Sequence, residues 1–560
     1  MTNTSKIKKG IKADNEPISK VDHHKFSLNN LSNAYLYTIT GVLAIIYFIF
    51  STFSDGFYMH DEPMFYMYAK DFLKDPITSF RGFQRIGYVL FLSLPSLGGF
   101  TFLNFFNSVL GAVTVMYSYK IIRKLGGGSS FLVFFIMGLQ PLWFMLVFRN
   151  LSEFLVAFLL VMTIWNHLQK KYIFSALLLS YVASSRIEYH SLLGFYFLWL
   201  IFKKQWIPAL LTGTFTLLHN FLGFLMTDDL LYLPNQVIAY SERMAGSYPK
   251  RGFDHYFNMS NVIFGGVTLT LFITYLGSKI VYRQKPVWII TFSALFLFLF
   301  NCLINWQSVE VGPGNAGNLR YIIPIIPLVS ILAVLAIDDI LKFQKKYILL
   351  IVLVPFLILV GWFLTYDHNF MSLLNGMKNG QFYEDQMVKS WKPLVIMAIV
   401  SVLIVLPLKQ KHYLITFSLL SIFLVMVDAR TFELDNEDTT MKKAGKWYTK
   451  HIKQYGNSDQ ALFTSNSRVA CSHILFYHFT DKGSNDFAQK PIIDFTKEDT
   501  DSMSVGDLVV WESHYGYKPK LRPTSQTYDF YDQSPNFEKI QYYQSKNKRF
   551  LVAFFRKIKN

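Results

Sequence analysis

The sequence predicts a polytopic α-helical membrane protein that carries a small soluble α/β domain at its C-terminal end. Of its 560 residues, 52% are hydrophobic and 17% aromatic, whereas only 16% are charged, well below the roughly 25% of soluble proteins. Apolar runs of membrane-spanning length recur from Ala34 to Val427. From Asp428 onward the composition becomes that of a soluble domain. Together these observations exclude a soluble single-domain protein.

The formal charge of +17 does not indicate nucleic-acid binding. The lysines fall in short clusters between apolar runs, which is the pattern that orientation by the positive-inside rule produces. Cys302 lies in an apolar run and Cys471 in the soluble tail, so we expect no disulfide. Residues 1–30 are polar and lysine-rich, and we expect a disordered cytoplasmic arm rather than a signal peptide.

The lysines of this arm place the start of the first span, residues 34–53, on the inside. The first outer loop, residues 54–99, therefore lies outside. Helical spacing with aromatic residues on one side predicts a short surface helix over 63–73. A second helix over 85–97 either lies on the surface too or begins the next span.

The stretch 172–199 is flanked by the lysine pairs 170–171 and 203–204, which both indicate the inside. The chain must therefore cross twice here, as two short helices with Arg186 and Glu188 at the outer turn. Short or broken helices in a membrane usually line a cavity.

Every lysine-rich turn falls on the same side, which gives about thirteen spans and places the tail outside. The chain then divides into the arm (1–30), a membrane domain (31–428) and an extracytoplasmic domain (429–560). The remaining predicted spans cover 100–122, 131–148, 154–167, 206–226, 262–281, 287–304, 322–337, 348–364, 393–408 and 414–427.

The tail is expected to fold as an α/β unit of about 130 residues. An amphipathic pattern predicts a helix over 439–454, and the residues from Ala461 predict a strand, a turn and a helix. Further strands are predicted at 490–495, 507–513, 537–544 and 549–557.

The outer ends of the predicted spans collect acids and arginines, whereas the inner turns are almost purely lysine. Arginine binds phosphate with a planar fork, so several outer arginines facing one cavity suit a lipid-linked phosphate. The alternative is that these residues form loop salt bridges. The set comprises Asp61, Glu62, Arg81, Arg85, Arg149, Glu153, Arg186, Glu188, Lys250, Arg251 and Arg320.

The adjacent acids Asp61 and Glu62 follow the first span directly, where carboxylates are costly unless they have a role. One carboxylate within reach of a hydroxyl suffices for a general base, so no cofactor is required. Two alternatives stay open. His60, Asp61 and Glu62 could ligate a divalent metal, or Glu62 could be a structural residue facing a helix N-terminus.

The order of these motifs resembles the GT-C superfamily of glycosyltransferases, polytopic enzymes that use polyprenyl-phosphate or dolichyl-phosphate sugars. The string HDEP at 60–63 resembles the HPDE motif of mannosyltransferases, although it lacks the proline between His and Asp. The strings at 85–99, 149–155, 184–195 and 318–328 resemble segments of protein mannosyltransferases and lipid A sugar transferases.

The resemblance implies an inverting transfer of a hexose, mannose among the candidates, from a polyprenyl-phosphate donor to a glycan, lipid or protein acceptor. The active site would face the outer side of a bacterial inner membrane. A flippase or transporter for lipid-linked glycans and a polysaccharide polymerase or ligase remain alternatives. The resemblance implies that Asp61 is the catalytic base, with Glu62 beside it. The residues implied to bind the donor phosphate are first Arg186 and Arg320, and then Arg81, Arg85, Arg149, Lys250 and Arg251. Those implied to contact the substrate are His60, Glu153, Glu188 and Tyr256.

Overall fold

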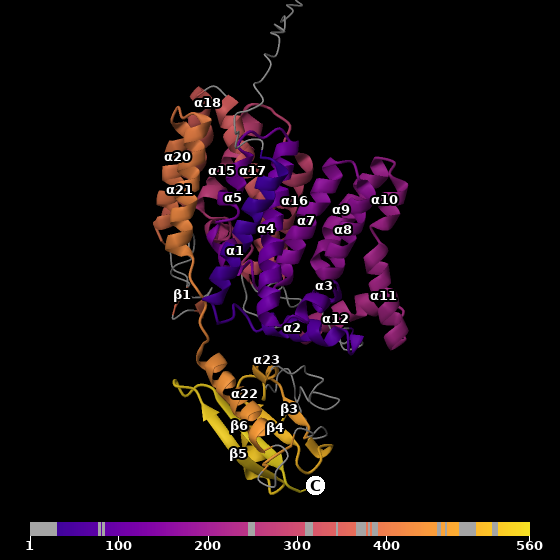
Figure 1. Cartoon of the computed structure of the whole chain (residues 1–560). Coiled ribbons are helices and arrows are strands. Elements are labelled where there is room, and N and C mark those ends of the chain that lie inside the picture. The colour runs from indigo at the N-terminus through magenta and orange to yellow at the C-terminus, as the bar shows by residue number, and fades with distance from the viewer. Residues whose placement is uncertain are drawn as a thin grey trace, which may run out of the picture.

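The computed structural model describes residues 31–76, 80, 85–244, 252–307, 317–342, 345–365, 377–378, 381–382, 390–455, 461–464, 467–480, 500–517 and 525–559. The predicted arm at 1–30 and the predicted strand at 490–495 lie outside these residues. Figure 1 shows a bundle of helices with a smaller part, which contains a sheet, packed below one end of it.

Within the described residues, six helical segments are long and apolar enough to cross a membrane, and a further seven apolar helices have 10–17 residues. The protein is therefore a multi-pass membrane protein. The helices before the sheet are α1 Asn33–Thr52, α2 Asp61–Phe72, α3 Ile86–Ser96, α4 Phe100–Lys124, η2 Ser130–Leu132, α5 Val133–Ile136, α6 Pro141–Leu146, α7 Ser152–Leu168, α8 Tyr172–Ser185, η3 Ile187–Tyr189, α9 His190–Phe202, α10 Trp206–Leu211, α11 Thr214–Thr227, α12 Tyr232–Met244, α13 His255–Asn258, α14 Ser260–Phe264, α15 Gly266–Val281, α16 Trp288–Gln307, η4 Leu319–Ile325, α17 Ile326–Lys342, α18 Lys345–Thr365, α20 Lys392–Val405 and α21 Gln410–Asp428.

Burial differs sharply among these helices. The segment formed by η4 and α17 is 89% buried over its most apolar window, whereas the segment formed by α10 and α11 is only 17% buried. Apolar side chains such as Leu210 (77% exposed) and Leu217 (69% exposed) therefore face outward. Exposed apolar side chains of this kind suit a helix that faces lipid, so α10 and α11 lie at the periphery of the bundle. The buried α17 lies at its centre.

The predicted broken hairpin is confirmed, because α8 and α9 are separate helices joined by η3 with Arg186 as the α8 C-cap. The two helices predicted over 63–73 and 85–97 are present as α2 and α3. The single predicted span over 131–148 is wrong. Pro141 has no N–H to continue a helix and instead begins α6, where the Gln140 side chain caps the Trp143 N–H.

The C-terminal part contains α22 Asn436–Tyr455, α23 Ile474–Thr480 and α25 Tyr528–Gln533 around a four-stranded sheet. Its order is β3-β4-β6-β5, with β3 parallel to β4 and the other pairs antiparallel. Val469 pairs with Leu508, and Leu508 with Arg556, which fixes the register. The strands are β3 Val469–Cys471, β4 Leu508–Glu512, β5 Phe537–Gln544 and β6 Leu551–Lys557; a separate hairpin pairs β1 Met377–Lys378 with β2 Gln381–Phe382.

The end of the bundle that faces the sheet carries α2, α3 and α12, and α22 and α23 lie directly beneath it (Figure 1). This junction brings the first outer loop and the start of the C-terminal part together. The Gly56 N–H donates to the Phe432 carbonyl at 3.0 Å, and the Phe432 N–H donates to Ser54 Oγ at 2.8 Å.

Candidate active site

Three consecutive residues at the start of α2 point in three directions. His60 is the N-cap, and Asp61 and Glu62 form the first turn, where acidic side chains suit the positive end of the helix dipole. Pro63 is tolerated there because the first-turn N–H groups have no intrahelical acceptor. Each helical residue is rotated by about 100° from the last, so each side chain meets a different partner.

Asp61 pairs with an arginine from a distant segment. Its Oδ2 lies 2.6 Å from Arg320 Nη2, and its side chain is 32% exposed. Burial raises the pKa of the Asp61 carboxyl, but the charges of Arg320 and Arg85 outweigh this and hold the pKa below its usual value. Asp61 is therefore an ionised carboxylate that is still open on one side.

Three arginines converge on a single buried carboxylate, that of Glu153 in the first turn of α7. Its Oε1 forms an ion pair with Arg186 Nη1 and lies 3.4 Å from Arg320 Nε and 3.9 Å from Arg85 Nη1. The Glu153 side chain is fully buried. The Glu153 carboxylate therefore holds these three cations together.

The Arg186 and Arg320 side chains both lie close to one aromatic ring. Arg186 lies 4.4 Å and Arg320 5.6 Å from the centre of the Tyr321 ring, and Arg186 also hydrogen bonds to Glu188 at 2.6 Å. Arg320 is 6% exposed, and its Nη1 is buried without a hydrogen-bond partner among the described residues. An unpaired buried guanidinium N–H is costly, so Arg320 has a donor group available for a ligand.

Glu62 occupies a different environment from Asp61. It is 1% exposed and accepts from the Tyr58 N–H at 2.6 Å and from Arg149 Nη1 at 3.1 Å. Arg149 in turn donates to the Gly56 carbonyl at 2.8 Å and to Ser54 Oγ at 2.6 Å. These contacts agree with a structural role for Glu62, and they show that Arg149 holds the loop that precedes α2.

Glu62→Gln is therefore expected to act on stability. Breaking a buried ion pair from one side typically costs about 3–5 kcal/mol, so the thermal midpoint of the purified protein should fall clearly. Asp61→Asn, at a partly exposed site, should leave this midpoint near that of the wild type. A Glu62→Gln protein with unchanged stability and no activity would instead place Glu62 in the chemistry.

Of the remaining predicted site residues, Tyr256 and His60 lie among the described residues, whereas three others do not. Tyr256 is fully buried and donates to the Asn318 carbonyl at 3.0 Å, and His60 contacts Asp438 and Tyr515 of the C-terminal part. Neither joins the arginine cluster. Arg81, Lys250 and Arg251 lie outside the described residues.

Two further residues adjoin the cluster, Ser152 and Tyr321, and neither is among the site residues predicted from the sequence. Arg85 Nη1 donates to Ser152 Oγ at 2.7 Å, and Ser152 Oγ donates to Glu153 Oε2 at 3.2 Å. The ring of Tyr321 lies beside both Arg186 and Arg320. Their positions follow from contacts between segments far apart in the chain, which no local pattern reveals.

An apolar cavity of about 610 Å³ lies between α7, α9 and α16. Its α7 residues run from Leu160 to Leu168, and Phe195, Trp199 and Phe292 line it from the other helices. At 1.5 Å per helical residue, this wall begins about 10 Å along α7 from Glu153. The cavity therefore lies deeper along a helix that starts in the arginine cluster.

No protein-family model and no curated protein matches the chain. Solved structures do. ArnT from Cupriavidus metallidurans bound to undecaprenyl phosphate superposes with a TM-score of 0.54 at 10% identity, over 94% of this chain and 98% of that one. Its apo state gives 0.54 at 12% identity, over 93% and 98%. The chain has the fold of ArnT. At 10–12% identity, this likeness is one of fold.

Proposed function

We propose that the protein is an inverting glycosyltransferase that moves a hexose from a polyprenyl-phosphate donor to an acceptor hydroxyl. The observation that carries this proposal is the contact between the half-open Asp61 carboxylate and Arg320, which also lies against Glu153. In this proposal Asp61 is the base and Arg320 binds the donor phosphate, so the two groups lie side by side in one site. The ArnT structure with undecaprenyl phosphate supports a polyprenyl phosphate as the lipid.

The chemistry assigns one task to each charged group. Asp61 accepts the proton of the acceptor hydroxyl while that oxygen forms a bond to the anomeric carbon. The bond from this carbon to the phosphate oxygen breaks on the opposite face, and the electron pair stays on the phosphate. Arg320, Arg186 and Arg85 stabilise the negative charge that develops there, because fixed cations act strongly where water is excluded.

Asp61 and the donor compete for Arg320 in this scheme. The Asp61 Oδ2 atom lies 2.6 Å from Arg320 Nη2. A phosphate has several oxygens, so it can form charge-assisted bonds both to the same fork and to the unpartnered Nη1. Arg320 then turns toward the phosphate, and the Asp61 oxygen becomes available to the acceptor hydroxyl. Donor binding thus prepares the base.

The apolar cavity beside α7 suits the isoprenoid tail of the donor. Its aromatic and aliphatic lining offers no charged partner except Lys203, so it favours hydrocarbon over sugar. The loop charges favour the outer face of the membrane for the Asp61 end of the bundle. We propose a hexose as the transferred sugar. The HDEP string at 60–63 is the feature that favours mannose among the hexoses.

The test uses purified full-length protein in lipid, synthetic polyprenyl-phosphate monosaccharides and a membrane extract as the source of acceptors. We expect stoichiometric release of free polyprenyl phosphate with at least one hexose donor. A flippase would release none, and a polymerase or ligase would require an oligosaccharide donor. Absence of release with every donor would overturn the proposal.

A further inference from the structure

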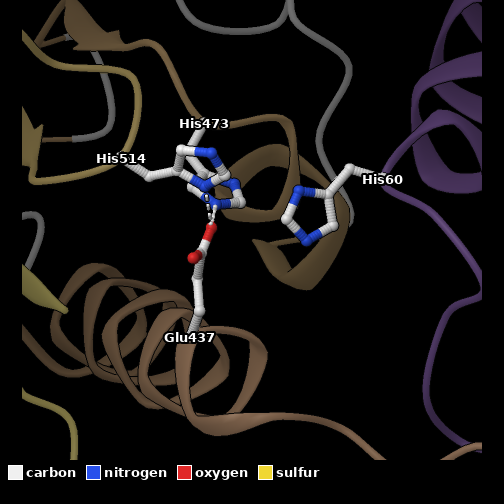
Figure 2. Close-up of side chains that lie close together, drawn as sticks. All are labelled: His60, Glu437, His473 and His514. Atoms are coloured by element: carbon white, nitrogen blue, oxygen red, sulfur yellow. Dashed lines mark hydrogen bonds and ion pairs between the residues drawn. The ribbon is translucent and has the colours of Figure 1, made fainter. Parts of the chain in front are cut away.

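The junction between the first outer loop and the C-terminal part contains a cluster of potential metal ligands outside the arginine cluster. His60, Glu437, His473 and His514 each offer one ligand atom, and these four atoms all lie within 4.8 Å of one another. Figure 2 shows His473 and His514 converging on the Glu437 carboxylate, with the His60 ring beside them from the other side of the junction.

Two of the imidazoles already share one oxygen. Glu437 Oε1 lies 2.7 Å from His473 Nε2 and 2.6 Å from His514 Nδ1. Ligands of a tetrahedral zinc ion with bonds of about 2.0–2.1 Å are about 3.3 Å apart. Small rotations of these side chains therefore replace the two hydrogen bonds by bonds to an ion. The 3.3 Å bond from the Leu475 N–H to His473 Nδ1 must be given up when Nε2 ligates.

The surroundings hold the ligands in place from behind. His60 Nε2 lies 3.1 Å from Asp438 Oδ1, the arrangement in which a carboxylate orients a ligating imidazole. The buried Glu512 accepts from the His514 N–H at 2.7 Å and from the Tyr515 N–H, which fixes the loop that carries His514. His473 itself is fully buried. Such second-sphere support is typical of metal sites and is not needed by exposed histidines.

We propose that these four residues bind one Zn²⁺ ion that fastens the C-terminal part to the loop bearing Asp61. Three imidazoles and a carboxylate form the nitrogen–oxygen donor set that zinc accepts in tetrahedral geometry. His60 directly precedes Asp61 in the sequence, so the ion would fix the start of α2. This inference rests on the cluster itself and does not depend on the proposed sugar transfer.

The test measures zinc in the full-length protein, purified through a tag without histidines, stripped with a chelator and reloaded with Zn²⁺. We expect one equivalent to remain after desalting of the wild type, and its thermal midpoint to rise on loading, since an ion that binds only the folded state stabilises it. Cobalt loading should give the intense visible absorption of a tetrahedral site.

Glu437→Gln keeps the shape of its side chain, and His514→Gln changes a side chain that is 39% exposed, so both variants should fold. Each should lose the bound equivalent and the zinc-dependent rise of the midpoint. His412→Gln, which changes an exposed histidine at the start of α21, should retain both. Equal zinc contents in the wild type and Glu437→Gln, or no retained zinc in the wild type, would show a hydrogen-bonded network without a metal site and overturn the proposal.

Discussion

Asp61→Asn is expected to lower the turnover number of sugar transfer by about 10²–10⁴-fold, the range that a positioned general base supplies. The amide keeps the shape of the side chain but cannot accept the proton. It also loses the ion pair with Arg320, which leaves this guanidinium free for the donor phosphate. The KM for the donor should therefore stay constant or fall while the turnover number collapses.

The matched control is Asp55→Asn, which changes an aspartate on the same loop whose side chain is 64% exposed. Its turnover should equal that of the wild type. Near wild-type turnover of Asp61→Asn would remove Asp61 from the role of base, whatever the effect on the donor KM.

Arg320→Gln is expected to lower kcat/KM for the donor by about 10²–10³-fold, the loss typical of one preorganised group that stabilises developing charge. Arg320→Lys keeps the charge but replaces the planar fork by a point charge, so it should recover only part of this loss. Arg430→Gln, at an exposed arginine beside the end of α21, serves as the control.

Arg320 and Asp61 act on one another in this account, so their effects should not add. The double variant Asp61→Asn with Arg320→Gln should lose less than the product of the two single losses. Because Arg320 also lies against the buried Glu153, the thermal midpoint of each variant separates a loss of folding from a loss of catalysis. Full multiplicative loss in a stable double variant would contradict the proposed exchange of Arg320 between Asp61 and phosphate.

The helical pattern was predictable because each step depends on local sequence. The lysine pairs around 172–199 require two crossings, and the structure has α8 and α9 with Arg186 between them. The helix at 63–73 follows from its spacing and Pro63, and α2 runs from Asp61 to Phe72. The predicted span at 131–148 failed because average hydropathy takes no account of Pro141, which interrupts the ladder of hydrogen bonds.

The partners of the charged residues could not be predicted in the same way. Asp61 meets Arg320, 259 positions later in the sequence, and Glu62 meets Arg149 instead. The sequence placed both acids near outer arginines, but a rotation of about 100° between neighbouring helical residues decides which arginine each one contacts. His60 was expected beside substrate, yet its partners lie in the C-terminal part, whose docking depends on tertiary contacts.

A structure determined with polyprenyl phosphate bound would show whether Asp61 and the arginines on Glu153 form one donor site. We expect the phosphate within hydrogen-bond distance of Arg320 and of Arg186 or Arg85, and the Asp61–Arg320 pair opened from 2.6 Å. The tail should enter the cavity lined by Trp199 and Phe292. A phosphate bound elsewhere, with the Asp61–Arg320 pair intact, would contradict the proposed donor site.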